Sequence, residues 1–202
     1  MKGAKSIALT FVTGNPNKLL EFQQIFKIHS NLQSLYTVTN SPIDLDELQG
    51  DSDFVALRKV QLASSLLPNT PVIIEDVSLN FTALNGLPGP YIKTFLSKLG
   101  REGLYSLIEH QKDKSAVAQC IYAYQRSPRD EARLFIGECR GQIVRPRGGT
   151  KFGWDPIFMP DDGNGETFGE MDPELKNKIS HRAKALKQVA DFLVEEHIRI
   201  RL

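Results

Sequence analysis

The segment Thr13-Gly14-Asn15-Pro16-Asn17-Lys18 joins a strand to a helix, and this junction decides the class of fold. Residues 7–12 (IALTFV) have the composition of a strand, and from Leu19 the apolar residues recur at helical spacing. A strand, a tight turn and a helix aim backbone N–H groups and a helix N-terminus at one place, which suits a phosphate. Lys18 adds a positive charge there. An ordinary turn with a surface lysine explains the hexapeptide equally well, and the chain contains no Walker A motif.

The composition is that of a globular protein with one domain or two small lobes. The chain has 202 residues, of which 41% are hydrophobic and 24% charged, and its net charge of +1 argues against binding to long nucleic acid. No apolar run has the length of a membrane span. Cys120 and Cys139 lack a C-x-x-C spacing, so we expect buried thiols in a reducing compartment and therefore a cytoplasmic protein.

The pattern of apolar residues predicts an α/β fold with a mixed central sheet flanked by helices. In the first half, strands alternate with helices that begin near residues 19 and 53, and the strands are expected at 7–12, 35–39 and 72–74. In the second half, alternating residues predict hairpin strands at 116–124, 132–136 and 142–144. Asp172-Pro173-Glu174 starts one further helix, and Ser180 caps the last one.

Two consecutive carboxylates, Glu75 and Asp76, follow the β-branched run at 72–74. We expect them at the carboxyl end of a buried strand, where open α/β sheets form their sites. Together with Glu47 in an acidic loop, Asp76 offers oxygen ligands to Mg²⁺, which prefers one or two carboxylates together with substrate phosphates. The alternative is a strand-end carboxylate that caps the next turn.

Cationic and aromatic residues elsewhere in the chain fit the other parts of a nucleotide. Lys93 lies in a predicted first helical turn, as do His181 and Arg182, where the helix dipole disfavours a cation unless it faces an anion or an electron-rich group. The segment Phe152-Gly153-Trp154-Asp155 offers rings that stack on a planar base and a carboxylate that binds its edge. A core aromatic beside a turn is the alternative. In combination these features describe a Mg²⁺-dependent nucleotide site.

At these residues the chain resembles the inosine triphosphate pyrophosphatase family, also called the Ham1-like non-canonical purine NTP pyrophosphatases. The resemblance runs nearly end to end and follows the family's order of five motifs: Thr13-Gly14-Asn15 with Lys18 and Glu21, Glu75-Asp76, Gly86-Leu87-Pro88-Gly89-Pro90-Tyr91-Ile92-Lys93, Phe152-Gly153-Trp154-Asp155, and Lys176-Asn177 with Ile179-Ser180-His181-Arg182. The third motif is similar in form to the eukaryotic branch.

This resemblance implies both a fold and an activity. The fold is a single ITPase-like domain over residues 1–202, also described as anticodon-binding-like, with two lobes and a nucleotide cleft between them. The activity is hydrolysis of ITP, dITP and XTP to the monophosphate and pyrophosphate, which cleanses the nucleotide pool. The resemblance further implies Mg²⁺ as cofactor, with Mn²⁺ as a substitute, and a cytoplasmic homodimer that binds neither nucleic acid nor membrane.

The resemblance also implies roles for individual residues. The expected phosphate-binding residues are Thr13, Gly14, Asn15, Lys18, Lys59 and Lys93. The expected metal ligands are Glu47 and Asp76, and the expected catalytic residues are Asp76, Glu75 and Lys18. Phe152 would stack on the base, and the other expected base-site residues are Gly153, Trp154, Asp155, Lys176, His181 and Arg182. Donors to a 6-oxo group would favour hypoxanthine and xanthine over adenine, which presents an amino donor there.

Two positions depart from the family pattern, and two other functions stay open. Val77 stands where the family usually has a hydroxyl residue, and Phe168-Gly169 stands where it often has Tyr-Ala. One alternative is a Maf-like pyrophosphatase with a different base preference, against which the base-site motifs argue. The other is a nucleotide-binding protein without turnover, against which the number of acids argues, because binding a polyanion does not require them.

Overall fold

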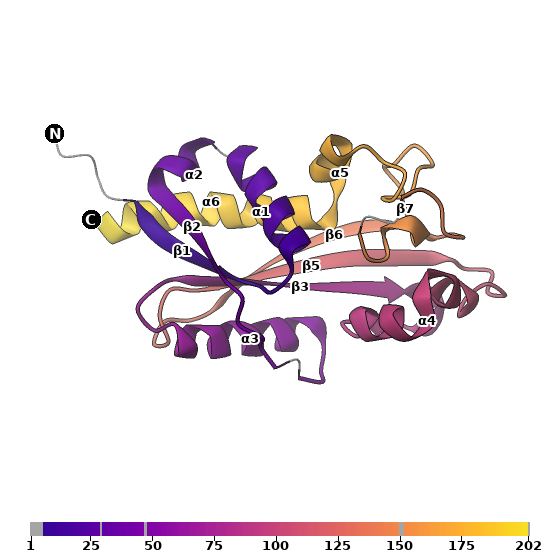
Figure 1. Ribbon diagram of the computed structural model, residues 1–202, viewed down its shortest axis with the longest axis horizontal. Coiled ribbons are helices and arrows are strands. Elements are labelled where there is room, and N and C mark those ends of the chain that lie inside the picture. Colours follow the sequence, from indigo (N-terminus) through magenta and orange to yellow (C-terminus); the bar gives the residue numbers. More distant parts are fainter. Residues whose placement is uncertain (1–5, 29, 47, 150–151, 202) are drawn as a thin grey trace. The chain divides into compact units, whose positions relative to one another are not determined.

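The structure is a computed structural model that describes residues 6–28, 30–46, 48–149 and 152–201 (Figure 1). Glu47, one of the two predicted metal ligands, lies outside the described residues. The strands are β1 (Ile7–Val12), β2 (Tyr36–Ser41), β3 (Val72–Phe81), β4 (Pro88–Gly89), β5 (Ser115–Gln125), β6 (Arg133–Ile143) and β7 (Phe158–Pro160). The α-helices are α1 (Pro16–Ile28), α2 (Ser30–Leu35), α3 (Ser52–Leu66), α4 (Ile92–Ser106), α5 (Pro173–Ile179) and α6 (His181–Arg201).

The strands of the described residues form one seven-stranded sheet in the order β2-β1-β3-β5-β6-β7, with β4 paired to β3. β1 runs parallel to both β2 and β3, and its register places Thr10 beside Val72 and Phe11 beside Ile73. The pairs β3–β4 and β6–β7 are antiparallel. The predicted α/β class with a mixed sheet is therefore confirmed, with the parallel pairs in the half where strands and helices alternate.

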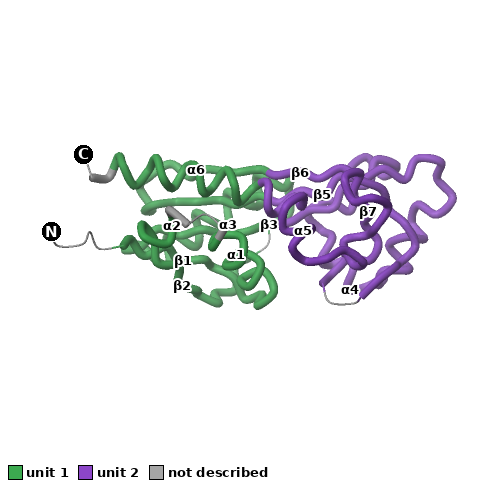
Figure 2. Tube along the Cα trace, turned by 90° about the horizontal axis from the view of Figure 1, so that it is seen from above, with its two compact units in different colours: residues 1–76, 121–136, 185–202 green, residues 77–120, 137–184 purple. Residues whose placement is uncertain are grey.

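The chain divides into two compact units (Figure 2). Unit 1 lies within residues 1–76, 121–136 and 185–202, and unit 2 comprises residues 77–120 and 137–184. The chain passes from one unit to the other within β3, β5, β6 and α6. Each unit is thus assembled from segments that are far apart in the sequence.

In unit 1 the sheet is covered on both faces by helices (Figure 1). Helices α1, α2 and α6 lie on one face and α3 lies on the other. The α3 residues Ala56, Val60 and Ala63, at the predicted helical spacing, are buried against β1, β3 and β5. On the opposite face the rings of Phe11 and Phe22 stack with centroids 4.6 Å apart. The sheet of unit 1 is therefore packed on both of its faces.

Unit 2 has its own core, in which aromatic residues from β7 and the neighbouring loops are buried with residues of β3, β5 and β6. Helix α4 packs Ile92 and Leu104 into this core and is broken at Gly100, whose φ of 66° and ψ of −176° are not helical. The helix predicted to begin at Pro90 begins at Ile92. Lys93 is therefore the second residue of α4 and lies in its first turn, as predicted.

Two of the predicted strand boundaries are wrong. The strand expected at 72–74 continues as β3 to Phe81, because Leu79 and Phe81 are buried in the core of unit 2. Glu75 and Asp76 thus lie inside a strand and not at its end. The strands expected at 132–136 and 142–144 are one continuous strand, β6, whose residues alternate between buried and exposed.

Cys120 and Cys139 are both buried thiols, as the sequence predicted. Burial raises the pKa of Cys139 to about 11, so its thiol stays protonated at neutral pH. Within the described ranges, no helix has both the length and the apolar composition needed to cross a membrane.

Candidate active site

The strand-turn-helix junction at the end of β1 forms as predicted, and Asn15 organises it. Asn15 Oδ1 accepts hydrogen bonds from the backbone N–H groups of Asn17 (3.0 Å) and Lys18 (3.3 Å). Thr13 Oγ1 in turn accepts from the backbone N–H of Asn15 at 3.1 Å. Asn15 therefore caps α1, which begins at Pro16, a residue without an N–H group. The first-turn N–H groups that we expected to face an anion are satisfied by this cap.

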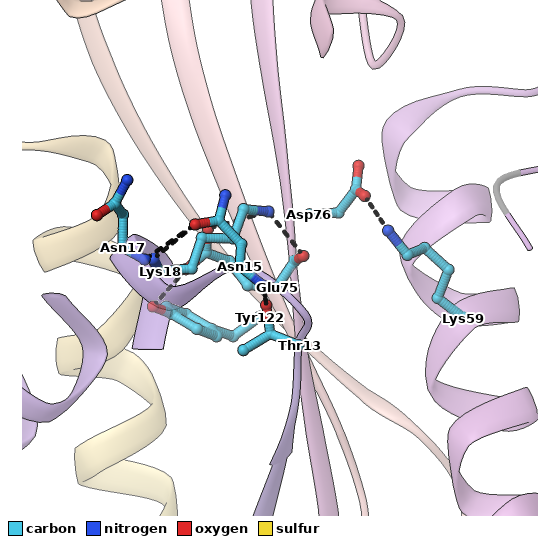
Figure 3. Close-up of polar contacts among 8 residues, drawn as sticks. All are labelled: Thr13, Asn15, Asn17, Lys18, Lys59, Glu75, Asp76 and Tyr122. Carbon is cyan, nitrogen blue, oxygen red and sulfur yellow. Dashed lines mark hydrogen bonds and ion pairs between the residues drawn. The ribbon is translucent and has the colours of Figure 1, made fainter. Parts of the chain in front are cut away.

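Glu75 lies beside this turn, where Lys18 and Tyr122 contact it (Figure 3). The Lys18 ammonium donates to the Glu75 carbonyl oxygen at 3.3 Å, and Lys18 Nζ is 3.4 Å from Glu75 Oε1. The Tyr122 hydroxyl, from β5, donates to Glu75 Oε2 at 2.9 Å. The motifs did not include Tyr122. A tyrosine at an inward position of a strand needs a hydrogen-bond partner for its hydroxyl, and this requirement is the sequence signal that could have identified Tyr122.

Asp76 points to the other face of the sheet, because consecutive side chains of a strand alternate in direction (Figure 3). There Lys59 of α3 donates to Asp76 Oδ1 at 2.8 Å, and each of the two side chains is 11% exposed. The two adjacent acids thus form two lysine–carboxylate pairs on opposite faces of β3. The alternative of a carboxylate that caps a turn is not what the structure contains.

The carboxylate of Asp76 has the chemistry required of a ligand to Mg²⁺. Across the described residues there is no group of three or more His, Cys, Asp or Glu side chains that could hold a metal ion. Mg²⁺ does not require such a cage, since it is commonly held by one or two carboxylates, substrate phosphates and water. A single buried carboxylate beside a predicted phosphate site meets this requirement.

The predicted base-site residues of unit 2 lie together. Lys176 of α5 is 2.5 Å from Asp155 Oδ2, and the two side chains are 8% and 7% exposed. The ring of Phe152 lies 4.8 Å from Lys176 Nζ and 5.2 Å from Arg182 Cζ, within the range of cation–π contacts. One aromatic ring, one carboxylate and two cations therefore meet at one place.

His181 and Trp154 belong to the core beside that group. The two rings have centroids 5.4 Å apart, and Phe168 lies 5.9 Å from His181. For Trp154 the core interpretation offered by the sequence is therefore the one that the structure supports. Ser180 Oγ accepts from the backbone N–H of Ala183 at 3.2 Å, which confirms Ser180 as the cap of α6. This cap places His181 and Arg182 in the first helical turn.

The segment that carries Phe152 is anchored by a residue that the motifs did not include. Arg101 Nε of α4 donates to the carbonyl oxygen of Gly153 at 2.7 Å. A lone arginine in a helix carries no sequence signal for such a role. Ser78, which follows Val77, does not replace the hydroxyl missing at 77, because it is buried and donates to Gln119 Oε1 at 3.2 Å.

Comparison with known proteins decides the family. The model of the Ham1 family matches residues 9–192. The chain belongs to the Ham1 family. Two relatives, both named inosine triphosphate pyrophosphatase, come from Mycosarcoma maydis and Scheffersomyces stipitis. The first is 48% identical over 92% of this chain and 94% of its own, and the second is 45% identical over 93% and 98%.

A solved Ham1 structure agrees with this assignment. The HAM1 protein from Coxiella burnetii superimposes with a TM-score of 0.80 at 26% identity, over 94% of this chain and 99% of its own. The family recognised from five motifs, and with it the classification as a pyrophosphatase enzyme, is thus confirmed. The two named relatives are fungal, in keeping with the eukaryotic form of the third motif.

Proposed function

We propose that this protein is a Mg²⁺-dependent pyrophosphatase that hydrolyses ITP, dITP and XTP to the monophosphate and pyrophosphate and so cleanses the nucleotide pool. One observation carries the proposal. Two consecutive buried acids each hold a lysine: Glu75 holds Lys18 beside the Asn15-capped turn, and Asp76 holds Lys59 on the other face of β3. Lysines held in place near acids suit a substrate that brings both a polyphosphate and a divalent cation.

Residues of unit 1 would bind the phosphates. Lys18 and Lys59 would neutralise charge on the reacting and leaving phosphates. Lys93, which belongs to unit 2, is a further phosphate-binding residue expected from the family resemblance. A Cβ atom on Gly14 would have no heavy atom within 4 Å among the described residues outside its immediate neighbours. Packing of the protein therefore does not require glycine there, and the open space suits a close approach of phosphate to the turn.

The chemical step is attack of water on the α-phosphorus with departure of pyrophosphate. Bound Mg²⁺ would neutralise phosphate charge as the leaving group departs. Asp76 would hold the metal, with Glu47 as the second expected ligand. Asp76 would also orient the attacking water or accept its proton, while Glu75 holds Lys18 against the turn.

Residues of unit 2 would select the base. Phe152 would stack on the purine, while Lys176 and Arg182 would donate hydrogen bonds to its 6-oxo group, with Asp155 keeping Lys176 in place. Adenine presents a donor at that position and so offers these cations no acceptor on the base there. His181 and Trp154 would support this group from the core beside it.

Release of pyrophosphate in the presence of Mg²⁺ tests the proposal, with ITP, XTP, GTP and ATP compared side by side. We expect rapid release from ITP and XTP, and kcat/KM for ATP lower by at least about 10²-fold, as for a site that is built to pair with one substrate group. Equal turnover of ATP would refute the base assignment. Binding of ITP without turnover of any nucleotide would instead establish a binding protein.

The Lys59–Asp76 pair leads to a prediction about metal affinity that does not depend on turnover. Lys59→Met removes the cation that Asp76 Oδ1 contacts, so that oxygen becomes available to Mg²⁺. Without nucleotide, Mg²⁺ should raise the Tm of this variant by several degrees more than that of the wild type, because about 1 kcal/mol of stabilisation shifts Tm by about 2–4 °C at this chain length.

The control for this measurement is Lys187→Met, which breaks an exposed pair with Asp191 in α6. Thermal unfolding with and without Mg²⁺ is then measured for the wild type, Lys59→Met and Lys187→Met, and each variant differs from the wild type by one lysine. An equal response to Mg²⁺ in all three would contradict the assignment of Asp76 as a ligand.

The proposal includes a cytoplasmic homodimer, which rests on the family resemblance. Sedimentation equilibrium of the purified protein tests the assembly, and a mass of twice that of the chain is the expected result.

A further inference from the structure

Tyr122 is a fully buried residue whose ring lies among aromatic rings of unit 1 and whose hydroxyl reaches the proposed phosphate site. Its ring lies with its centroid 6.2 Å from that of Phe11 and 5.7 Å from that of Phe22. A tyrosine has two side-chain torsions, so these contacts on the ring also fix the hydroxyl. The hydroxyl is directed at Glu75 Oε2, 2.9 Å away.

Glu75 is buried, and its two carboxylate oxygens face different donors. Tyr122 donates to Oε2, and Lys18 Nζ lies 3.4 Å from Oε1. A buried carboxylate is stable only when its oxygens are paired, so the position of each donor constrains the carboxylate. The hydroxyl of Tyr122 therefore selects the orientation in which the other oxygen faces Lys18.

Lys18 has a flexible four-carbon stem, so its ammonium needs fixed acceptors to stay in one place. Among the described residues Glu75 provides two acceptors for it, the carbonyl oxygen (3.3 Å) and Oε1 (3.4 Å). Lys18 is also the residue whose backbone N–H is capped by Asn15. The same lysine is thus tied to the turn by its backbone and to Glu75 by its side chain.

We propose that Tyr122 is a positioning residue for the phosphate site: it holds Glu75 so that Glu75 keeps the Lys18 ammonium beside the Asn15-capped turn. The inference rests on the proposed function, since it assigns Lys18 to the phosphates. It gives Glu75 a role distinct from that of Asp76, which faces α3 on the other side of β3. The aromatic core fixes the Tyr122 hydroxyl, and this hydroxyl orients the Glu75 carboxylate. Glu75 in turn holds the Lys18 ammonium where it would bind phosphate.

The chain provides a matched pair of variants, Tyr122→Phe and Tyr124→Phe. Tyr124 lies two residues further along β5 and is also buried, but its hydroxyl has no hydrogen-bond partner among the described residues. Each substitution removes one buried hydroxyl and keeps the ring, and only the first removes a hydrogen bond. The probe is inorganic pyrophosphate with Mg²⁺, titrated by calorimetry into the full-length protein.

We expect Tyr122→Phe to raise the Kd of pyrophosphate about tenfold, the low end of what a hydrogen bond to a charged group contributes. Tyr124→Phe should stay within about twofold of the wild type. In the Lys18→Met background, Tyr122→Phe should have no further effect, because it acts through Lys18. A merely structural role would raise the Kd by the same factor in both backgrounds, and that result would overturn the inference.

Glu75→Gln provides a second variant that keeps the side-chain shape and an acceptor for Tyr122 but weakens the hold on Lys18. It should also raise the pyrophosphate Kd, and an unchanged value would overturn the inference even if Tyr122→Phe does not fold.

The ITP assay distinguishes failure of the proposed function from failure of this inference. A wild type that neither hydrolyses ITP nor binds pyrophosphate refutes the proposed function and this inference together. An active wild type whose Tyr122→Phe variant behaves like Tyr124→Phe refutes this inference alone.

Discussion

We expect replacement of Asp76 with asparagine to lower kcat/KM for ITP by between about 10²- and 10⁴-fold, the range for loss of a group that moves a proton in the transition state. Asparagine keeps the shape of the side chain and an acceptor for Lys59, which lies 2.8 Å from Asp76 Oδ1. It has no negative charge for Mg²⁺ and cannot take a proton from water. The loss should therefore appear mainly in kcat, together with a higher Mg²⁺ concentration for half-maximal rate.

The control for Asp76→Asn is Asp191→Asn, since Asp191 is also a lysine-paired carboxylate, at 3.1 Å from Lys187, but on the exposed surface of α6. This variant should keep the wild-type rate and Mg²⁺ dependence. Urea denaturation of each variant shows that the measured protein is folded. Retention of more than about a tenth of the activity by Asp76→Asn would contradict its assignment as metal ligand and base.

The second large effect concerns stability. Lys176→Met leaves the carboxylate of Asp155 buried without the ammonium that lies 2.5 Å from it, where the two side chains are only 8% and 7% exposed. Breaking one side of a buried ion pair costs about 3–5 kcal/mol of unfolding free energy, because the remaining charge stays desolvated. Urea denaturation followed by circular dichroism measures this loss.

Lys187→Met is the matched control for Lys176→Met, because it breaks a lysine–aspartate pair whose side chains are 71% and 64% exposed. Such a surface pair contributes about 0.3–0.5 kcal/mol. The double variant Lys176→Met/Asp155→Asn should recover part of the lost stability, since no uncompensated charge is left in the pair. Similar losses for the two single lysine variants would show that burial of the Asp155 pair does not determine its strength.

The local features of this fold are readable from the sequence. The strand at Ile7–Val12 and the cap at Ser180 agree with the structure because neighbouring residues determine them. The end of β3 was not predictable in this way. It depends on antiparallel pairing of Leu79 with Gly89, which brings together residues that belong to different elements. Where a strand ends depends on the neighbouring strands that pair with it, and the sequence of one strand does not show which strands these are.

The candidate site shows the same limit. The motifs identified Lys18 and the two acids, and the family resemblance added Lys59. Neither showed which lysine pairs with which acid, because that depends on the two faces of β3. Tyr122 lies 47 residues from Glu75 in the chain and belongs to no motif. Its partner becomes visible only when β5 is placed in the sheet. The sequence motifs thus predicted the residues that would carry out the chemistry. The residues that orient them could be identified only from the folded structure.

The division of the chain has a consequence for how such an enzyme acquires a new base preference. The polypeptide crosses between the two units four times, at positions 76/77, 120/121, 136/137 and 184/185, and each crossing falls inside a strand or a helix. No single cut releases either unit as one continuous piece. A single-segment exchange by gene fusion or recombination therefore does not transfer unit 2, to which we assign base selection, as one cassette. We therefore expect changes of specificity to arise by substitutions within the segments of unit 2 that leave both cores folded.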